Sequence, residues 1–302
     1  MYRVLIPLAA GATLALSGPP PAAAATALPD CAGSRPARAL LTGQGQIESL
    51  AFDTSGRLLF TDRVRKALLV VDRRGARPRV LASGIADPGG IAFDRQGRIY
   101  VGFGNNIANG QGAPAKGNAG LYVIDPRSGR KRVFARGLSM ANGVVRARDG
   151  TFYASDDFKP TVDRISPRGR VQRAWSRAPF TNGLALDATG RWLYANRSGS
   201  PTAVLRIDTR NGRFTTWASP PASFANAFLD GLARRGGTLY AAAFGAGQVW
   251  RIDARRRICV LHRGAAGFSS VAPGPGRRGF SARSVYAAGY RGDLLELPRA
   301  AG

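Results

Sequence analysis

The chain has 302 residues, of which 44% are hydrophobic, so it can bury a sizeable core and does not have the composition of a disordered polymer. Its 44 lysines and arginines outnumber 18 aspartates and glutamates, and the formal net charge is +26. The arginines recur singly, mostly in turns such as Asp94–Arg98, and do not gather with aromatic residues on a recognition helix. We therefore expect no nucleic-acid partner, and an anionic surface is the alternative explanation of the charge.

The N-terminus has the pattern of a secretory signal peptide. Met1–Arg3 supplies a short positive start, Val4–Leu16 is mostly apolar, and small residues at Ala23–Ala25 suit cleavage. This predicts a signal peptide over residues 1–25 and a secreted or periplasmic protein, with an uncleaved anchor as the alternative. No later stretch approaches 18 uninterrupted apolar residues, so we expect no membrane span in the mature chain.

Cys31 and Cys259 are the only two cysteines of the chain. An exported protein meets an oxidising environment, so this pair predicts one disulfide. Two cysteines alone cannot form a structural zinc site.

The rest of the chain repeats six times, with about 39 to 53 residues between equivalent positions. The units begin at residues 48–53, 89–94, 142–145, 182–187, 230–233 and 269–272. A glycine-containing turn and a β-rich run follow each start, at 58–62, 99–102, 152–156, 192–196, 239–242 and 285–288. A third run lies at 67–72, 120–125, 161–166, 203–208, 248–253 and 293–298, and most units show a fourth. No unit has a convincing helical period.

Four short strands in each of six units predict an all-β fold, a six-bladed β-propeller that forms a single domain over residues 26–302. The last unit lacks an outer strand after Leu297, and we expect the upstream segment Ala37–Leu41 to supply it and close the ring. Closure would bring Cys31 close to the outer strand that contains Cys259.

One repeated position carries most of the candidate chemistry. The first strand of each blade lines the channel of a propeller, so residues at the start of these strands form a ring. That ring consists of Glu48, Gly89, Asn142, Asn182, Asp230 and Ser269. Two carboxylates and two amide carbonyls suit a hard divalent cation, calcium before zinc, with the glycine and serine leaving open positions. The alternative is that Asn-Gly and Asp-Gly merely begin the strands, although each unit has its own hairpin glycines further on.

These motifs resemble the gluconolactonase/regucalcin (senescence marker protein) family, in the calcium-dependent propeller superfamily that includes paraoxonase and diisopropyl fluorophosphatase. The resemblance spans Gln46 to Leu297 and depends on Glu48, Asn142-Gly143 and the Asn-Gly-Leu-Ala and Asp-Gly-Leu-Ala motifs that begin at Asn182 and Asp230. It implies that Glu48, Asn142, Asn182 and Asp230 hold one divalent ion.

The chain also departs from its apparent relatives. Glu48 is followed by Ser-Leu where many relatives have proline and tryptophan. The histidine dyad of the paraoxonase type is impossible, because His262 is the only histidine and its sequence position places it on an outer strand.

The ring and the resemblance together predict a hydrolase of lactones or related esters that acts on a small molecule as a monomer. A bound cation would polarise the carbonyl, and Asp230 would act as the base for water, with direct attack by Asp230 as the alternative. We expect substrate contacts from loops at the channel mouth, namely from Asn105, Asn106, Asp156, Asn196 and Phe244. The resemblance implies a substrate-binding asparagine in the second blade, at Asn105 or Asn106. A noncatalytic binding propeller with a structural ion, and a strictosidine-synthase-like or lyase activity, are the alternative functions.

Overall fold

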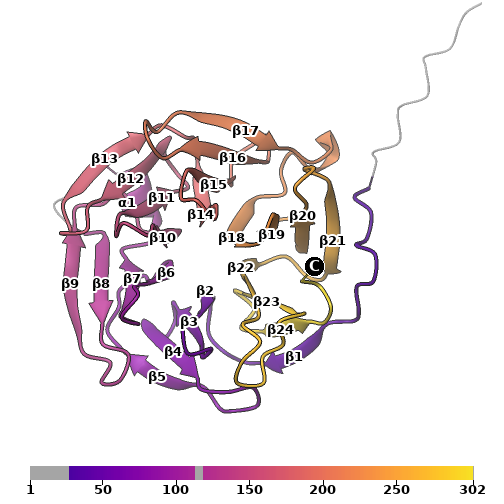
Figure 1. The fold of residues 1–302 in the computed structure, drawn as a ribbon, viewed down its shortest axis with the longest axis horizontal. Coiled ribbons are helices and arrows are strands. Elements are labelled where there is room, and N and C mark those ends of the chain that lie inside the picture. The colour runs from indigo at the N-terminus through magenta and orange to yellow at the C-terminus, as the bar shows by residue number, and fades with distance from the viewer. Residues whose placement is uncertain (1–26, 113–117, 302) are drawn as a thin grey trace, which may run out of the picture.

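The computed structural model describes residues 27–112 and 118–301. Within these residues, 24 strands form six four-stranded antiparallel sheets arranged around a central axis (Figure 1). The predicted six-bladed β-propeller is confirmed, and the described residues add only one short helix, α1 (Ile107–Gln111), and one 3-10 turn, η1 (Ala222–Phe224).

We number the blades by the chain order of their innermost strands. Blade 1 contains β2 (Ile47–Phe52), β3 (Leu58–Asp62), β4 (Ala67–Val71) and β5 (Arg79–Ala82). Blade 2 contains β6 (Ile91–Phe93), β7 (Ile99–Phe103), β8 (Gly120–Ile124) and β9 (Lys131–Arg136). Blade 3 contains β10 (Val144–Arg146), β11 (Phe152–Asp156), β12 (Thr161–Ile165) and β13 (Val171–Ser176).

Blade 4 contains β14 (Thr181–Leu186), β15 (Trp192–Arg197), β16 (Ala203–Asp208) and β17 (Phe214–Ala218). Blade 5 contains β18 (Leu229–Arg235), β19 (Thr238–Ala243), β20 (Gln248–Ile252) and β21 (Ile258–Arg263). Blade 6 contains β22 (Phe268–Pro273), β23 (Val285–Gly289), β24 (Leu294–Leu297) and, from the other end of the chain, β1 (Arg38–Leu41).

The core lies between neighbouring blades. Strands β3, β4, β7 and β11 are buried along their whole length, which explains why they are mostly apolar on both faces, with polar residues at the ends of β3 and β11. Phe60 of blade 1 and Tyr286 of blade 6, for example, belong to one apolar cluster that the two sheets share. One blade cannot cover both of its own faces, so the units are stable only as a ring.

Ring closure joins the two ends of the chain, as the sequence predicts. Strand β1 pairs antiparallel with β24, with Arg38 opposite Glu296 (Figure 1). The preceding segment also pairs with blade 5, where Asp30 bridges to Val260 of β21. Beside this bridge, a disulfide joins Cys31 to Cys259, whose Cα atoms lie 4.9 Å apart and are separated by 228 positions in the sequence.

Three of the isolated arginines belong to a recurrent turn. The Asp53 carboxylate accepts hydrogen bonds from the backbone N–H groups of Ser55 and Arg57, and it forms an ion pair with the Arg57 side chain at 2.7 Å. The same pairing recurs four residues apart in Asp94–Arg98 and in Asp253–Arg257.

The predicted signal peptide, residues 1–25, lies outside the described residues. Among the residues that the structure describes, no helix is both long and apolar enough to cross a membrane.

Candidate functional site

The six residues predicted to form a ring lie where the innermost strands begin, and we call them the hub ring. Asn142, Asn182, Asp230 and Ser269 border a cavity of about 300 Å³ in the central channel. Asn182 and Asp230 also border a second cavity of about 440 Å³, which we call the mouth cavity. These two residues therefore lie between the channel and the mouth cavity. The strands that carry the ring are those nearest the axis in Figure 1.

Two members of the hub ring have a packing role instead of leaving open positions for a ligand. A Cβ atom at Gly89 would lie 1.9 Å from the carbonyl oxygen of Ala141, so the backbone of blade 3 fills the space beside it. Ser269 is buried, and its hydroxyl donates a 2.5 Å hydrogen bond to the carbonyl of Ile47 in blade 1. Neighbouring innermost strands approach each other closely at both positions, which explains the glycine at position 89 and the small serine at position 269.

A second set of equivalent residues follows the second strand of each blade, and we call it the mouth ring. Its members are Arg63, Asn105, Asp157, Ser198, Phe244 and Tyr290. In five blades the backbone N–H of this residue donates to the carbonyl of the residue two places before the hub ring, namely Gln46, Asp87, Phe180, Phe228 and Gly267. Strand register places Asp157 at the same position in blade 3, because Ala154 pairs with Val144 as Ala195 pairs with Leu184.

Three mouth-ring residues hold the buried Glu48 carboxylate in place. Asn105 Nδ2 donates to Oε1 at 2.7 Å, and the Tyr290 hydroxyl donates to Oε2 at 2.5 Å. Arg63 Nη1 lies 3.5 Å from Oε2 and donates to the backbone carbonyl of Asn105 at 2.8 Å. Burial raises the pKa of Glu48 in spite of the hydrogen bond from Tyr290 and the charge of Arg63. The Glu48 side chain is therefore fixed before any ligand arrives.

Two further carboxylates lie on the opposite side of the hub. Asn182 Nδ2 lies 3.5 Å from Asp157 Oδ2, and the Asn142 side chain acts to lower the pKa of Asp157. Burial raises the pKa of Asp157 to about 6. Burial, and then the charges of Glu48 and Asp157, hold the pKa of Asp230 well above its ordinary value. The charges of these carboxyl groups oppose one another's ionisation, and Arg63 offsets this effect only in part.

Cation binding fits these residues. Asn105 Oδ1 and Asp157 Oδ1 are buried acceptors with no hydrogen-bond partner, and a positive ion would satisfy such oxygens. The donors are carboxylates and amides, the oxygen ligands that calcium prefers. No group of three or more His, Cys, Asp or Glu side chains within residues 27–112 and 118–301 has the arrangement of a metal site, so the amides of Asn142 and Asn182 would have to complete the ligand set.

The residues predicted to contact the substrate do not all reach the mouth cavity. Asn105 supports Glu48, and Phe244 lines the mouth cavity, where its ring meets Tyr290 edge-on at 5.3 Å. Asn106 caps helix α1 by accepting from the Asn109 N–H at 2.9 Å, and it donates to Asp87.

Asp156 and Asn196 are buried and do not line the mouth cavity. Asp156 accepts from the Phe158 N–H at 2.9 Å. Asn196 Nδ2 donates to the backbone carbonyls of Asp230 and Gly231, so it positions the start of β18.

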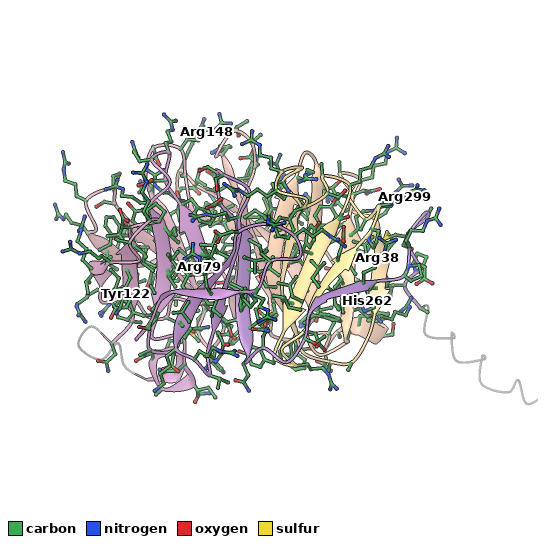
Figure 2. The ribbon with its side chains drawn as sticks, turned by 90° about the horizontal axis from the view of Figure 1, so that it is seen from below. Arg38, Arg79, Tyr122, Arg148, His262 and Arg299 are labelled. Carbon is green, nitrogen blue, oxygen red and sulfur yellow. A yellow bond between two sulfur atoms is a disulfide. The ribbon has the colours of Figure 1, made fainter. Side chains whose placement is uncertain are left out.

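Arg63, Asp157 and Tyr290 are not among the residues that the sequence predicts for the site. Their signal in the sequence is a shared place just after the second strand of each repeat, where Asn105 and Phe244 are predicted. His262 lies on β21 and packs against Phe268 at 5.5 Å, on the outer side of the ring (Figure 2).

Solved structures of other proteins resemble this fold. No protein-family model and no curated protein matches the chain. Among solved structures it is similar to a gluconolactonase from Xanthomonas campestris, with 20% identity, a TM-score of 0.69, and coverage of 88% of this chain and 90% of that one. It is also similar to virginiamycin B lyase from Staphylococcus aureus, with 16% identity, a TM-score of 0.58, and coverage of 85% and 82%.

A third similar structure is an auxiliary nutrient binding protein from Bacteroides ovatus, with 12% identity, a TM-score of 0.65, and coverage of 86% and 76%. At these identities the comparisons show a shared fold and no more. Because the three proteins have different functions, the hub residues must carry the functional argument.

Proposed function

We propose that this protein is a secreted or periplasmic hydrolase of lactones or related esters that depends on a divalent cation, with calcium preferred. The observation that carries the proposal is the hub, where the charges of Glu48, Asp157 and Asp230 act on one another and the buried oxygens Asn105 Oδ1 and Asp157 Oδ1 lack a hydrogen-bond partner. The fold likeness to a gluconolactonase supports the reaction class.

Glu48, Asn142, Asn182 and Asp230 would hold the cation, and a bound cation supplies positive charge beside the substrate carbonyl. Asp230 lies at the mouth cavity, where the carbonyl and the attacking water would meet. Asp230 is the hub carboxylate that borders both the channel cavity and the mouth cavity, so we assign it as the base. Asn105, Tyr290 and Arg63 keep Glu48 in one orientation during the reaction.

The other two function classes have less support. The S. aureus lyase structure is described as a catalytically inactive variant with a histidine replaced by alanine. The single histidine of this chain, His262, lies on an outer strand away from the hub, so a histidine-dependent lyase reaction has no equivalent group here. A purely structural ion does not explain why Asp157 and Asp230 border a cavity that could admit a small molecule.

The test is hydrolysis of a panel of lactones, aryl esters and phosphotriesters by the purified protein, in chelator and after calcium is restored. We expect chelation to abolish turnover and calcium to restore it. Asp230→Asn should lower kcat by about a hundredfold or more. Asp125→Asn, which changes an exposed turn, is the matched control. Full activity in chelator, or in Asp230→Asn, would contradict the proposal. A cation-dependent melting temperature with no turnover on any substrate would indicate a structural ion.

A further inference from the structure

The mouth cavity is apolar above a polar floor. Asp157, Asn182 and Asp230 form the floor, and the walls come largely from Phe158, Phe228, Leu229, Phe244 and Tyr290. No lysine or arginine lines it. Four aromatic rings around one opening suit an apolar ligand, because aromatic side chains contribute large contact areas.

The two wall hydroxyls are already engaged. The Ser198 hydroxyl donates to the carbonyl of Leu229 at 2.7 Å, and the Tyr290 hydroxyl donates to Glu48. Each hydroxyl has only one proton to donate, so neither remains as a donor to a ligand oxygen. Beyond the polar floor, the hydroxyls of a polyhydroxylated ligand such as a sugar lactone would lose hydrogen bonds to water without replacing them along these walls.

Blades 4 and 5 each have an exposed phenylalanine at the equivalent position, with the same backbone conformation. Phe180 and Phe228 each lie two residues before a hub-ring residue, are 39% and 49% exposed, and have φ values of +50° and +48°. The left-handed backbone region is unfavourable for such side chains, and residues kept there cluster at functional sites. Their carbonyls accept hydrogen bonds from the Ser198 and Phe244 N–H groups, which hold both backbones.

Glycine accommodates both rings. A Cβ atom at Gly245 would lie 2.8 Å from the Phe228 ring, and one at Gly199 would lie 3.0 Å from the Phe180 ring. Strand register makes these glycines equivalent, since Arg197 pairs with Thr181 as Ala243 pairs with Leu229. Two blades thus present the same ring-over-glycine arrangement, and Gly199, Gly245 and Phe228 all line the mouth cavity.

We infer that the mouth cavity binds the apolar arm of the substrate, so that the preferred substrates are lactones or esters with an uncharged alkyl or aryl substituent and not sugar lactones. This inference rests on the proposed hydrolase function and names its substrate class. The reacting carbonyl would lie at the floor near Asp230, and the arm would extend along Phe244 and Phe228 toward the opening.

The first test compares kcat/KM across δ-valerolactone, δ-octalactone, δ-decalactone and δ-dodecalactone, with glucono-δ-lactone alongside, in saturating calcium. We expect kcat/KM to rise roughly two- to fourfold for each added methylene until the cavity is filled, because each buried methylene favours binding. A flat or falling series, or faster turnover of glucono-δ-lactone than of every alkyl lactone, overturns the inference and leaves the hydrolase proposal standing.

The second test is Phe228→Asn, because asparagine tolerates the left-handed backbone region while removing the ring. The ratio of kcat/KM on δ-dodecalactone to that on δ-valerolactone should fall about tenfold, the effect of losing part of a buried aromatic contact. Phe214→Asn is the matched control, since Phe214 is 41% exposed on outer strand β17. It should leave the ratio unchanged, and equal ratios in the two variants would overturn the inference.

A binding measurement separates this inference from the proposed reaction. The δ-lactam with a heptyl substituent resists hydrolysis and keeps the shape of δ-dodecalactone. If no lactone is hydrolysed, the hydrolase proposal fails. The apolar pocket still stands in that case if calorimetry shows that the lactam binds and that Phe228→Asn weakens this binding about tenfold. Absence of lactam binding to the unaltered protein overturns the inference.

Discussion

Asp156 gives the clearest prediction about stability. Its side chain is 1% exposed at the end of β11, with Oδ1 accepting from the Phe158 N–H and Oδ2 buried without a partner. Burial raises its pKa from 3.8 to about 7, and the negative charge of Asp157 adds to the effect. Replacing it by asparagine keeps the Oδ1 acceptor and removes the ionisable group.

The direction of the pH dependence follows from which state binds the proton of Asp156 more tightly. The folded protein does so, and the contribution of Asp156 to the free energy of unfolding therefore falls as pH rises from about 4 to about 7 and is then level. At about 1.4 kcal/mol per pH unit the cost of ionisation is at most about 4 kcal/mol. Asp156→Asn removes that cost but buries an amide N–H without an acceptor, so we expect a net gain of about 2 kcal/mol at pH 8.

Urea unfolding monitored by tryptophan fluorescence, in chelator, measures this effect at pH 8 and pH 4. The gain should be present at pH 8 and absent at pH 4. Asp125→Asn provides an opposite control, because hydrogen bonds from Ser128 lower the pKa of Asp125 and its removal should not stabilise the protein at pH 8. The reasoning fails if Asp156→Asn is less stable than the parent at pH 8, or if its effect is the same at both pH values.

Three further predictions concern the ring and the hub. Gly89→Ala places a Cβ atom 1.9 Å from a backbone oxygen and should lower the free energy of unfolding in urea by at least about 3 kcal/mol. Gly190→Ala, with open space beside it, should lower it by about 1 kcal/mol. Similar losses in the two variants would contradict the packing argument. Replacing Cys31 and Cys259 together by serine should cost about 3 to 5 kcal/mol, and reductant should destabilise the parent but not this variant. Glu48→Gln removes a buried negative charge and should weaken calcium binding by calorimetry about tenfold or more, so unchanged affinity would exclude Glu48 as a ligand.

The hub and mouth rings have one side that is held by side-chain hydrogen bonds and another that borders a cavity. On the side of blades 1, 2 and 6, the residues Arg63, Asn105 and Tyr290 immobilise Glu48. On the side of blades 3 to 5, Asp157, Ser198 and Phe244 border the open cavity. A site held on innermost strands of several blades gains precision from the packed core behind it.

The sequence alone determined the number of blades, the four-stranded units and the closing strand. Each depends on local features that recur in every unit, such as the turn after Asp53 or Asp94 and the apolar runs on either side of it. It also located the hub ring, because residues at the start of each repeat must surround the axis once the blades are known. The pairing of Cys31 with Cys259 likewise depends on the ends meeting at blades 5 and 6.

Only the tertiary structure decided which residue of each second strand reaches the mouth. The side chains of a strand alternate between faces, so a shift of one position exchanges Asp157, which borders the cavity, for Asp156, which is buried beside it. Register shifts between the first and second strands of blades 1, 4, 5 and 6 also change which residues lie opposite the hub ring, and the sequence does not reveal them. The hold on Glu48 by Tyr290, 242 positions away, exists only because the ring closes.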